Sequence, residues 1–271
     1  MKTAMIQMPV TDSKEQNIQT ALNYLKNAAQ EGAELAVLPE MFCSLYRNRD
    51  FIKNAEGHQG PAWQAMAKAA ADLGLWLVAG SIPEQDGDRL YNTSFVFDPS
   101  GHQIARHRKV HMFDIRVKNG QWFRESATFT PGEDVTVFDT PFGKLGLCIC
   151  FDLRFPELSM LMALKGARAI IVPASFNMTT GPAHWELLFR QRAVDNQLHT
   201  IGVAPARDVN GPYVSYSNSI LCSPWGEVLR RAGHEPELIV ADIDLDRNEV
   251  IRDQLPLLSA RRTGVYNTVE K

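Results

Sequence analysis

The sequence predicts a single α/β domain that spans residues 1–271 and folds as a four-layer helix–sheet–sheet–helix sandwich. Two observations predict this architecture. The chain contains two halves that repeat one order of helix and strand patterns, and 45% of its residues are hydrophobic, enough for a sizeable core. Because two helices on one face of a sheet leave its other face apolar, two such sheets are expected to pack face to face.

The repeat is visible as an apolar strand bounded by the same residues in both halves. Residues 32–42 (GAELAVLPEMF) and 166–176 (GARAIIVPASF) share Gly-Ala, a short apolar run, Pro and Phe in register. Each follows a helical pattern, at Lys14–Gln30 and Pro156–Lys165. Later segments match in the same order: 60–63 with 181–185, 75–80 with 198–204, and 92–101 with 217–226. The shared order makes chance similarity the weaker explanation.

Composition excludes several classes of protein. The net charge of −3 gives no strong attraction to nucleic acid or to anionic membranes, and no apolar run approaches the roughly 20 residues that span a bilayer. The first residues form a strand pattern broken by Gln7, which is too short for a signal peptide. The four cysteines show neither a disulfide framework nor a zinc spacing. We therefore expect a reduced, cytoplasmic and metal-free protein.

Cys150 is the first candidate for chemistry. It lies at the end of an apolar run, Leu145–Phe151, which predicts a buried strand, and a helical pattern starts at Pro156. A thiol just before a helix N-terminus lies where the helix dipole favours the thiolate. The alternative is a small core residue, the commonest role of a cysteine in an apolar strand. Cys148 alternates with Cys150 along the strand, so only one of them can face a given site.

Glu40 is the second candidate, a carboxylate at the end of another predicted strand. The short strand Glu34–Leu38 is ended by Pro39, and two large apolar residues follow Glu40. Poor solvation raises the pKa of a carboxyl group and suits it to proton transfer near neutral pH. The alternative is a carboxylate on the rim that points to water.

Lys109 is the third candidate and follows the predicted strand Ile104–His107. Apolar neighbours, Val110, Met112 and Phe113, suggest that its ammonium points into a partly apolar site, where it could stabilise an oxyanion. A basic surface turn is the alternative. Because open α/β sheets place their sites at the carboxyl ends of strands, the three groups are expected to share one cleft.

Three blocks of sequence around these residues resemble those of the nitrilase superfamily of carbon–nitrogen hydrolases. They are Leu38-Pro39-Glu40, Arg108-Lys109-Val110-His111 and Ile149-Cys150-Phe151-Asp152, in the order and spacing of that family. The resemblance covers nearly the whole chain and implies an αββα sandwich. It also implies a single carbon–nitrogen hydrolase domain that needs no cofactor and forms a homodimer.

The resemblance implies a role for each group. Glu40 is then the general base, Cys150 the nucleophile that forms an acyl-enzyme, and Lys109 with the backbone N–H of Phe151 the oxyanion hole. A further family carboxylate corresponds to Glu125, which would orient Lys109 and the substrate. The sequence leaves open whether Glu40 or Lys109 gives a proton to the departing ammonia.

The segment 176–188 (FNMTTGPAHWELL) resembles the ω-amidase group of this superfamily. The implied substrates are small dicarboxylate monoamides: 2-oxoglutaramate, 2-oxosuccinamate and succinamate. The alternatives are a deaminated-glutathione amidase, a hydrolase of carbamoyl or nitrile substrates, and a silent member kept as a scaffold. The intact set of Glu40, Lys109 and Cys150 argues against the last.

A carboxylate substrate requires a cation near the cleft, and Arg154 is the best candidate because a guanidinium pairs a carboxylate bidentately. An internal ion pair of Arg154 with Asp152 or Glu157 is the alternative. Further candidates for substrate-binding walls are Tyr46, Asn177 and Thr180, whose alternative role is loop structure. For His184, a packed or capping role is expected rather than catalysis.

Overall fold

The computed structural model describes residues 1–271, and two six-stranded sheets form its centre. The first sheet has the strand order β14 (Glu237–Asp242), β1 (Lys2–Gln7), β2 (Leu35–Val37), β3 (Trp76–Asp86), β4 (Arg89–Phe97) and β5 (Gln103–Arg108). The second has the order β8 (Thr136–Thr140), β9 (Gly143–Leu147), β10 (Ala169–Pro173), β11 (His199–Val203), β12 (Ile220–Cys222) and β13 (Val228–Arg231).

The two sheets share one topology, which confirms the repeat predicted from the sequence. In each sheet three central strands are parallel, β1–β2–β3 in the first and β9–β10–β11 in the second. Two antiparallel strands follow on one side, and one antiparallel strand closes the other side. That closing strand is β8 in the second sheet but β14 in the first. The chain therefore returns from its second half to complete the sheet of the first.

Six α-helices and two 3₁₀ helices complete the fold. The α-helices are α1 (Lys14–Gln30), α2 (Asn48–Asn54), α3 (Pro61–Leu73), α4 (Pro156–Leu164), α5 (Gly181–Asn196) and α6 (Arg247–Gln254); the 3₁₀ helices are η1 (Glu125–Ala127) and η2 (Cys150–Arg154). Ser13 caps α1 by accepting the N–H of Gln16, and proline occupies the first turn of α3, α4 and α5 as predicted.

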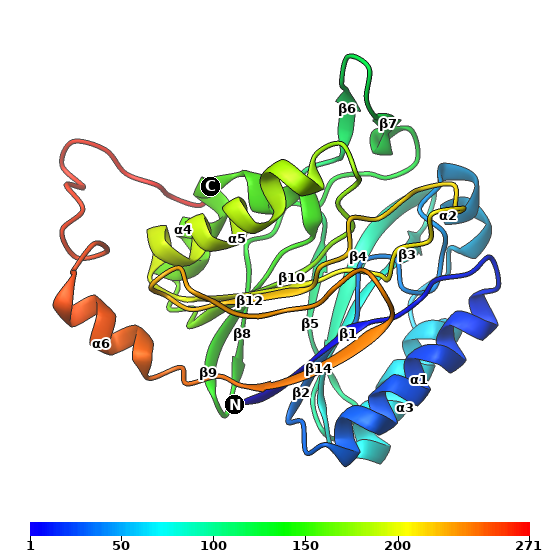
Figure 1. The fold of residues 1–271 in the computed structure, drawn as a ribbon, viewed down its shortest axis with the longest axis horizontal. Coiled ribbons are helices and arrows are strands. Elements are labelled where there is room, and N and C mark those ends of the chain that lie inside the picture. Colours follow the sequence, from blue (N-terminus) through cyan, green and yellow to red (C-terminus); the bar gives the residue numbers. More distant parts are fainter.

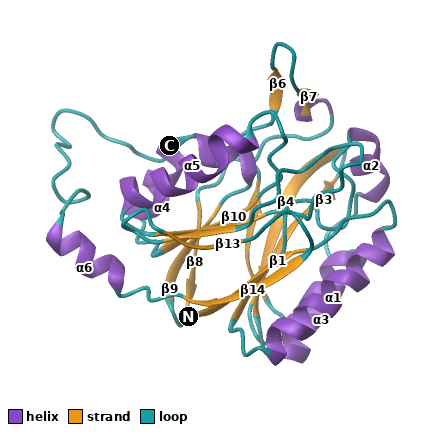
Figure 2. Cartoon of the chain, in the orientation of Figure 1, coloured by secondary structure: helices purple, strands orange, loops and turns teal.

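The layers follow from where the helices pack. In Figure 1, α1 and α3 lie on one outer face and α4 and α5 on the opposite one, and Figure 2 shows the strands between them. Alternation along each strand separates the cores. In β1, Ala4 and Ile6 pack toward the helices, whereas Met5 joins the core between the two sheets. The structure is thus the four-layer sandwich that the sequence predicts.

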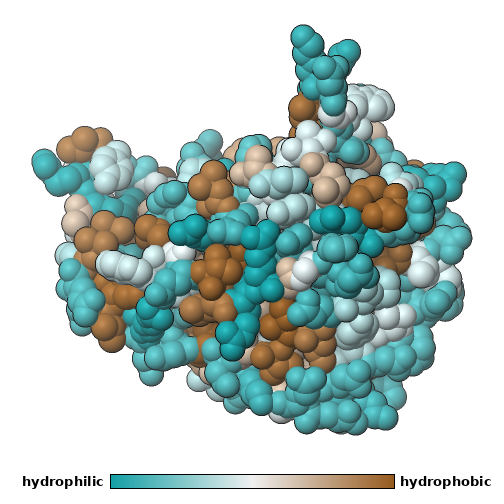
Figure 3. Space-filling view, viewed as in Figure 1, coloured by the Kyte–Doolittle hydropathy of each residue, from teal (hydrophilic) through white to brown (hydrophobic).

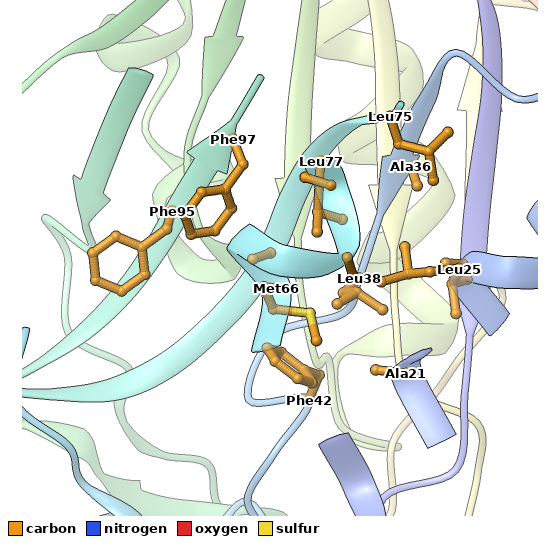
Figure 4. Packing of buried hydrophobic residues seen from close by; sticks show 14 of the residues in the cluster. Ala21, Leu25, Ala36, Leu38, Phe42, Met66, Leu75, Leu77, Phe95 and Phe97 are labelled. Atoms are coloured by element: carbon orange, nitrogen blue, oxygen red, sulfur yellow. The ribbon is translucent and has the colours of Figure 1, made fainter. Parts of the chain in front are cut away.

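The helix-facing core of the first half is drawn in Figure 4. Leu25 of α1 and Met66 of α3 pack there with Leu38, Leu77 and Phe97 from the sheet. The equivalent core of the second half is built around Trp185 and Phe189 of α5. The middle core takes residues from both sheets, so neither half is closed without the other.

Some element ends differ from the prediction. The strand expected over Leu145–Phe151 ends at Leu147, because the chain turns before Cys150 into η2. Four further elements, β8, β14, α2 and α6, are not predicted by the sequence patterns. Nor is a two-stranded hairpin formed by β6 (Asp114–Arg116) and β7 (Trp122–Arg124). No helix has both the length and the apolar character required to cross a membrane.

Candidate active site

Glu40 is held at the end of β2 by a close approach of β3. Gly80 of β3 has a φ of +38°, and a Cβ at this position would lie 2.1 Å from the carbonyl oxygen of Pro39, so only glycine permits the contact. On the other side of Glu40, the N–H of Met41 donates to Oγ of Ser81 at 3.1 Å. The Glu40 carboxyl is consequently 1% exposed, and the alternative of a rim carboxylate is excluded.

Lys109 enters the same interior from the end of β5. Its N–H donates to the carbonyl of Asn92 at 2.8 Å, and its own carbonyl accepts from the N–H of Gly132 at 2.8 Å. The side chain is fully buried, so it does not belong to a surface turn. Its ammonium donates to Oε1 of Glu40 at 2.9 Å and lies 2.8 Å from Oε2 of Glu125.

Glu125 opens the 3₁₀ helix η1, which follows the β6–β7 hairpin. Its Oε2 also accepts the N–H of Phe113 at 2.6 Å, and this bond joins the two ends of the hairpin. The amide of Asn92, in β4, donates to Oε1 of Glu125 at 3.0 Å and to Oε1 of Glu40 at 2.9 Å. Three segments remote in sequence thus meet in one buried ionic cluster.

Burial and charge shift the pKa values of this cluster in opposite ways. Burial raises the pKa of Glu40 and outweighs the opposing charge of Lys109, with a further rise from Glu125. Burial also acts to lower the pKa of Lys109, but the carboxylates of Glu125 and Glu40 more than offset it and raise this pKa. Glu40 is therefore suited to accept and return a proton, whereas Lys109 remains an ammonium ion.

Cys150 lies at the turn from β9 into η2 with a φ of +47°, a left-handed conformation that is rare for a residue with a side chain. Such strain persists only where the surroundings impose it, and it is frequent at functional sites. Burial, then the charge of Glu40, raises the pKa of the Cys150 thiol well above its usual value. The expectation that the helix dipole favours a resting thiolate is therefore wrong, and the thiol needs a base.

Asp152 joins the Cys150 turn to the segment after Lys109. Its carboxylate accepts hydrogen bonds from the backbone N–H of Ile149 at 3.0 Å and of His111 at 2.8 Å. It also contacts a ring nitrogen of His111 at 2.8 Å and one of His107 at 3.0 Å. Although burial opposes it, the hydrogen bonds from the two histidines hold the pKa of Asp152 well below its ordinary range. This single carboxylate fixes the nucleophile turn against the lysine loop.

Tyr46 lies beside the cluster at the inner end of a cleft. Its hydroxyl donates to Oε1 of Glu40 at 3.4 Å, and its ring lies 4.6 Å from that of Tyr213. Both tyrosines line this cleft, together with Glu40, Ser44, Ser175, Asp208 and Ser215. Glu40 thus forms part of the wall of this cleft, whereas Cys150, Lys109 and Arg154 are not among its lining residues.

Arg154 takes neither of the ion pairs proposed as its alternative role, since neither Asp152 nor Glu157 contacts it. Its guanidinium lies over the rings of Phe176, at 4.7 Å, and Phe151, at 5.5 Å. Nη1 lies 3.1 Å from Nδ1 of His184, and Nε is buried without a partner. This cation next to the Cys150 turn is thus available to an anionic ligand.

The sequence pattern of the carbon–nitrogen hydrolase family matches residues 2–253. The chain belongs to this family. The omega-amidase NIT2 of Xenopus tropicalis is 44% identical over 270 residues, 100% of this chain and 98% of that protein. The omega-amidase NIT2 of Homo sapiens is 42% identical over 265 residues, 98% of this chain and 96% of that protein.

A solved structure places this carbon–nitrogen hydrolase in the nitrilase superfamily. Saccharomyces cerevisiae Nit3, a member of branch 10 of that superfamily, superposes with a TM-score of 0.89 at 40% identity, over 97% of this chain and 96% of that one. Both the family resemblance inferred from the three sequence blocks and the αββα fold are thereby confirmed.

Two further wall candidates of this carbon–nitrogen hydrolase contribute to loop structure. Oδ1 of Asn177 accepts the N–H groups of Thr179 at 3.0 Å and Thr180 at 2.9 Å, and the hydroxyl of Thr180 at 3.1 Å. The amide nitrogen of Asn177 is buried without a partner and stays available to a ligand. His184 is exposed and contacts Arg154, so the packed role expected for it is wrong.

Sequence reasoning missed two residues of the site. The sequence predicts Asp152 only as part of the block around Cys150 and as an alternative ion-pair partner of Arg154, and it predicts Asn92 only as part of the repeat. The sequence holds one signal for Asn92, because Asn92-Thr93-Ser94 is a polar run within a strand pattern, and all three residues are completely buried in β4. Buried polar groups need partners, and this run required some. No group of three or more His, Cys, Asp or Glu side chains is arranged to hold a metal ion.

Proposed function

We propose that this carbon–nitrogen hydrolase is an ω-amidase, which hydrolyses the terminal amide of small dicarboxylate monoamides to the acid and ammonia. The substrates in this class are 2-oxoglutaramate, 2-oxosuccinamate and succinamate. Identities of 42–44% to omega-amidases over almost the whole chain support the proposal. The same proposal assigns catalysis to Glu40, Lys109 and Cys150, with Glu125 as the partner of Lys109.

The observation that most favours this substrate class is the guanidinium of Arg154. It lies on the nucleophile turn, four residues after Cys150; its side-chain hydrogen bond goes to His184 and not to a carboxylate, and its Nε has no partner. The distal carboxylate of a short monoamide can pair with this cation while its amide carbon faces the thiol. A neutral amide would leave the same guanidinium unpaired, which disfavours its binding.

Acylation begins with proton transfer from the Cys150 thiol to Glu40, whose raised pKa makes it a competent base. The sulfur attacks the amide carbon, which becomes tetrahedral, and the carbonyl oxygen becomes an oxyanion. The Lys109 ammonium and the backbone N–H of Phe151 stabilise that charge. Lys109 is ready for this task because its two carboxylate partners keep it protonated.

Collapse of the tetrahedral intermediate breaks the C–N bond and leaves a thioester on Cys150. The leaving nitrogen takes up the proton that Glu40 holds, since the raised pKa of Lys109 makes its ammonium the poorer acid. Glu40 then removes a proton from water, whose oxygen attacks the thioester carbon. The C–S bond breaks to release the acid, and Glu40 returns the proton to the Cys150 sulfur. Each turnover consumes one amide and one water, and returns Glu40 and Cys150 to their starting states.

The test is ammonia release from 2-oxoglutaramate and succinamate, measured beside deaminated glutathione, a carbamoyl amine and a nitrile. We expect the small monoamides to give the highest kcat/KM. A preference for deaminated glutathione would reject the ω-amidase assignment and favour the neighbouring group with the same chemistry. Turnover of none of these compounds would contradict the proposed enzyme altogether.

We further propose a homodimer and a cytoplasmic location. Apolar side chains are exposed on and beside α5 and α6: Leu187, Val194, Trp225, Val250 and Leu255. Figure 3 shows apolar surface gathered on the side of the molecule that includes α6. All four cysteines are free and buried, in keeping with a reducing compartment. The mass in solution tests the dimer, and a monomeric mass at micromolar concentration would contradict it.

A further inference from the structure

The carboxylate oxygens of the catalytic cluster are not equally occupied. Oε1 of Glu125 accepts from Lys109 and Asn92, and Oε2 of Glu125 contacts Phe113 N–H and Lys109. Oε1 of Glu40 accepts from Lys109, Asn92 and Tyr46. Oε2 of Glu40 is buried and has no hydrogen-bond partner. One oxygen of four is therefore free to take a proton.

Asn92 is the one residue that donates to both carboxylates with a neutral side chain. Its amide nitrogen has two hydrogens, and these go to Glu40 at 2.9 Å and to Glu125 at 3.0 Å. The side chain is completely buried, and its Oδ1 has no partner. Only the amide nitrogen can face two carboxylates, so the chemistry fixes the orientation of this group.

The backbone of Asn92 also holds the third member of the cluster, because its carbonyl accepts the N–H of Lys109 at 2.8 Å. That contact does not depend on the side chain. A substitution at Asn92 therefore removes the two amide hydrogen bonds and leaves the anchor of the Lys109 backbone in place.

We propose that Asn92 is a positioning residue for the catalytic base: by donating to Oε1 of Glu40 it directs Oε2 of that carboxylate to the Cys150 thiol. This inference rests on the proposed function, since it takes Glu40 as the base. Glu125 is not available as the base for a separate reason, because its Oε2 accepts the N–H of Phe113 and contacts Lys109.

The proposal has a consequence for protonation as well as for geometry. A hydrogen bond donated to a carboxylate stabilises its charged form, so loss of the Asn92 amide raises the pKa of Glu40 further. The other groups that influence Glu40 are unchanged by the substitution; they are Lys109 after β5, Glu125 in η1, Cys150 in η2, Tyr46 before α2, and Tyr213 across the cleft. If Asn92 acted only through its backbone contact with Lys109, the substitution would leave the protonation of Glu40 unaltered.

The first experiment compares pH profiles of kcat/KM for wild type, Asn92→Ala and a control, Ser94→Ala. Ser94 is two residues along the same strand, is equally buried, and its hydroxyl has no partner. We expect Asn92→Ala to lower kcat about ten- to a hundredfold, the loss typical of a hydrogen bond to a charged group. The acidic limb of the kcat/KM profile of this variant should move to higher pH, and its KM should change little. Ser94→Ala should keep the wild-type limb.

An unmoved acidic limb in Asn92→Ala overturns the proposal, whatever the loss of rate. If that variant does not fold, Asn92→Asp provides the same test. It keeps the shape of the side chain but replaces the donor by an anion, which raises the pKa of Glu40 and moves the acidic limb to still higher pH. An unmoved limb in Asn92→Asp overturns the proposal equally.

A second measurement separates this inference from the proposed function. In the Cys150→Ala background, ¹³C-NMR titration of the Glu40 carboxyl needs no substrate. An upward shift on adding Asn92→Ala supports the positioning role even if the substrate class proves wrong. No shift refutes it even if the monoamides are turned over.

Discussion

The ends of β2 and β10 occupy equivalent places in the two half-sheets, yet their surroundings differ. At β10 the ladder is regular: Pro173 pairs with Val203, and the N–H of Ala174 donates to Val203 at 2.8 Å. At β2 the equivalent of Val203 is Gly80, where β3 bends and its pairing with β4 is interrupted. The residue after Pro39 is Glu40, whereas the residue after Pro173 is Ala174.

This difference shows how two half-sheets of the same topology supply different catalytic groups. Both halves supply a strand end at the cleft, but only the first changes its backbone there to bury a carboxylate. The second half supplies the nucleophile from a different strand, β9, whose counterpart β1 is followed by Met8, Pro9 and Val10. The shared topology builds the walls, and a few local substitutions supply the chemistry.

The largest effect is expected from removing the carboxylate that distinguishes the first half. Glu40→Gln should lower kcat by about a hundred- to ten-thousandfold, the range for loss of a general base. The fold should be unchanged, as judged by the thermal unfolding midpoint. Glu31→Gln, the same substitution on an exposed side chain, is the matched control. Equal rates for the two variants would refute the base assignment.

A smaller effect is expected from making the backbone of the first half resemble that of the second. Gly80→Ala should lower the free energy of unfolding by about 3 kcal/mol, because the new Cβ meets the Pro39 carbonyl at a positive φ. It should lower kcat about a hundredfold by displacing Glu40. Gly233→Ala is the control, since no atom lies within 4 Å of a Cβ there. A fully active Gly80→Ala would show that the bend does not position Glu40.

The next effect concerns the second half alone. Arg154→Ala should raise KM for succinamate about tenfold to a hundredfold, the range expected when a charged hydrogen bond is lost. The KM of a neutral amide of similar length should change little. Steady-state kinetics on both substrates check this prediction. Parallel changes in the two KM values would indicate that Arg154 supports the turn rather than the ligand.

The smallest effect is a shift in pH dependence. Glu40 must be ionised to take the thiol proton, and burial raises its pKa above the ordinary value of 4.5. Activity should be present above this raised pKa and should be lost as the pH falls through it. The acidic limb of kcat/KM against pH should therefore have its midpoint above 4.5. A midpoint at or below 4.5 would argue against a buried base.

The sequence predicted those parts of this account that depend on local patterns. The limits of α1, the strand before Pro39 and the prolines that open three helices follow from periodicity and capping, which neighbouring residues determine. The repeat predicted two matching sheets. The return of β14 to the first sheet was not predictable, because a strand pattern does not state its partner.

At the site, the sequence predicted the residues that stand next to apolar runs, but it did not predict the hydrogen bonds that join them to distant segments. Glu40 and Cys150 stand out at the ends of apolar runs. The contacts of Asn92 with the two carboxylates and of Asp152 with the two histidines join residues 33 to 52 positions apart, and only the folded chain brings them together. The thiolate expected at Cys150 failed for the same reason, since the burial and the nearby Glu40 charge are tertiary effects.

The central claim is that Cys150 is the nucleophile that Glu40 activates. The most direct test is rapid acid quench of the enzyme during turnover of succinamate, followed by mass spectrometry of its peptides. The account predicts an acyl group on the peptide that contains Cys150, and neither acylation nor ammonia release in Cys150→Ala. Acylation at another residue, or turnover by Cys150→Ala, would contradict the account.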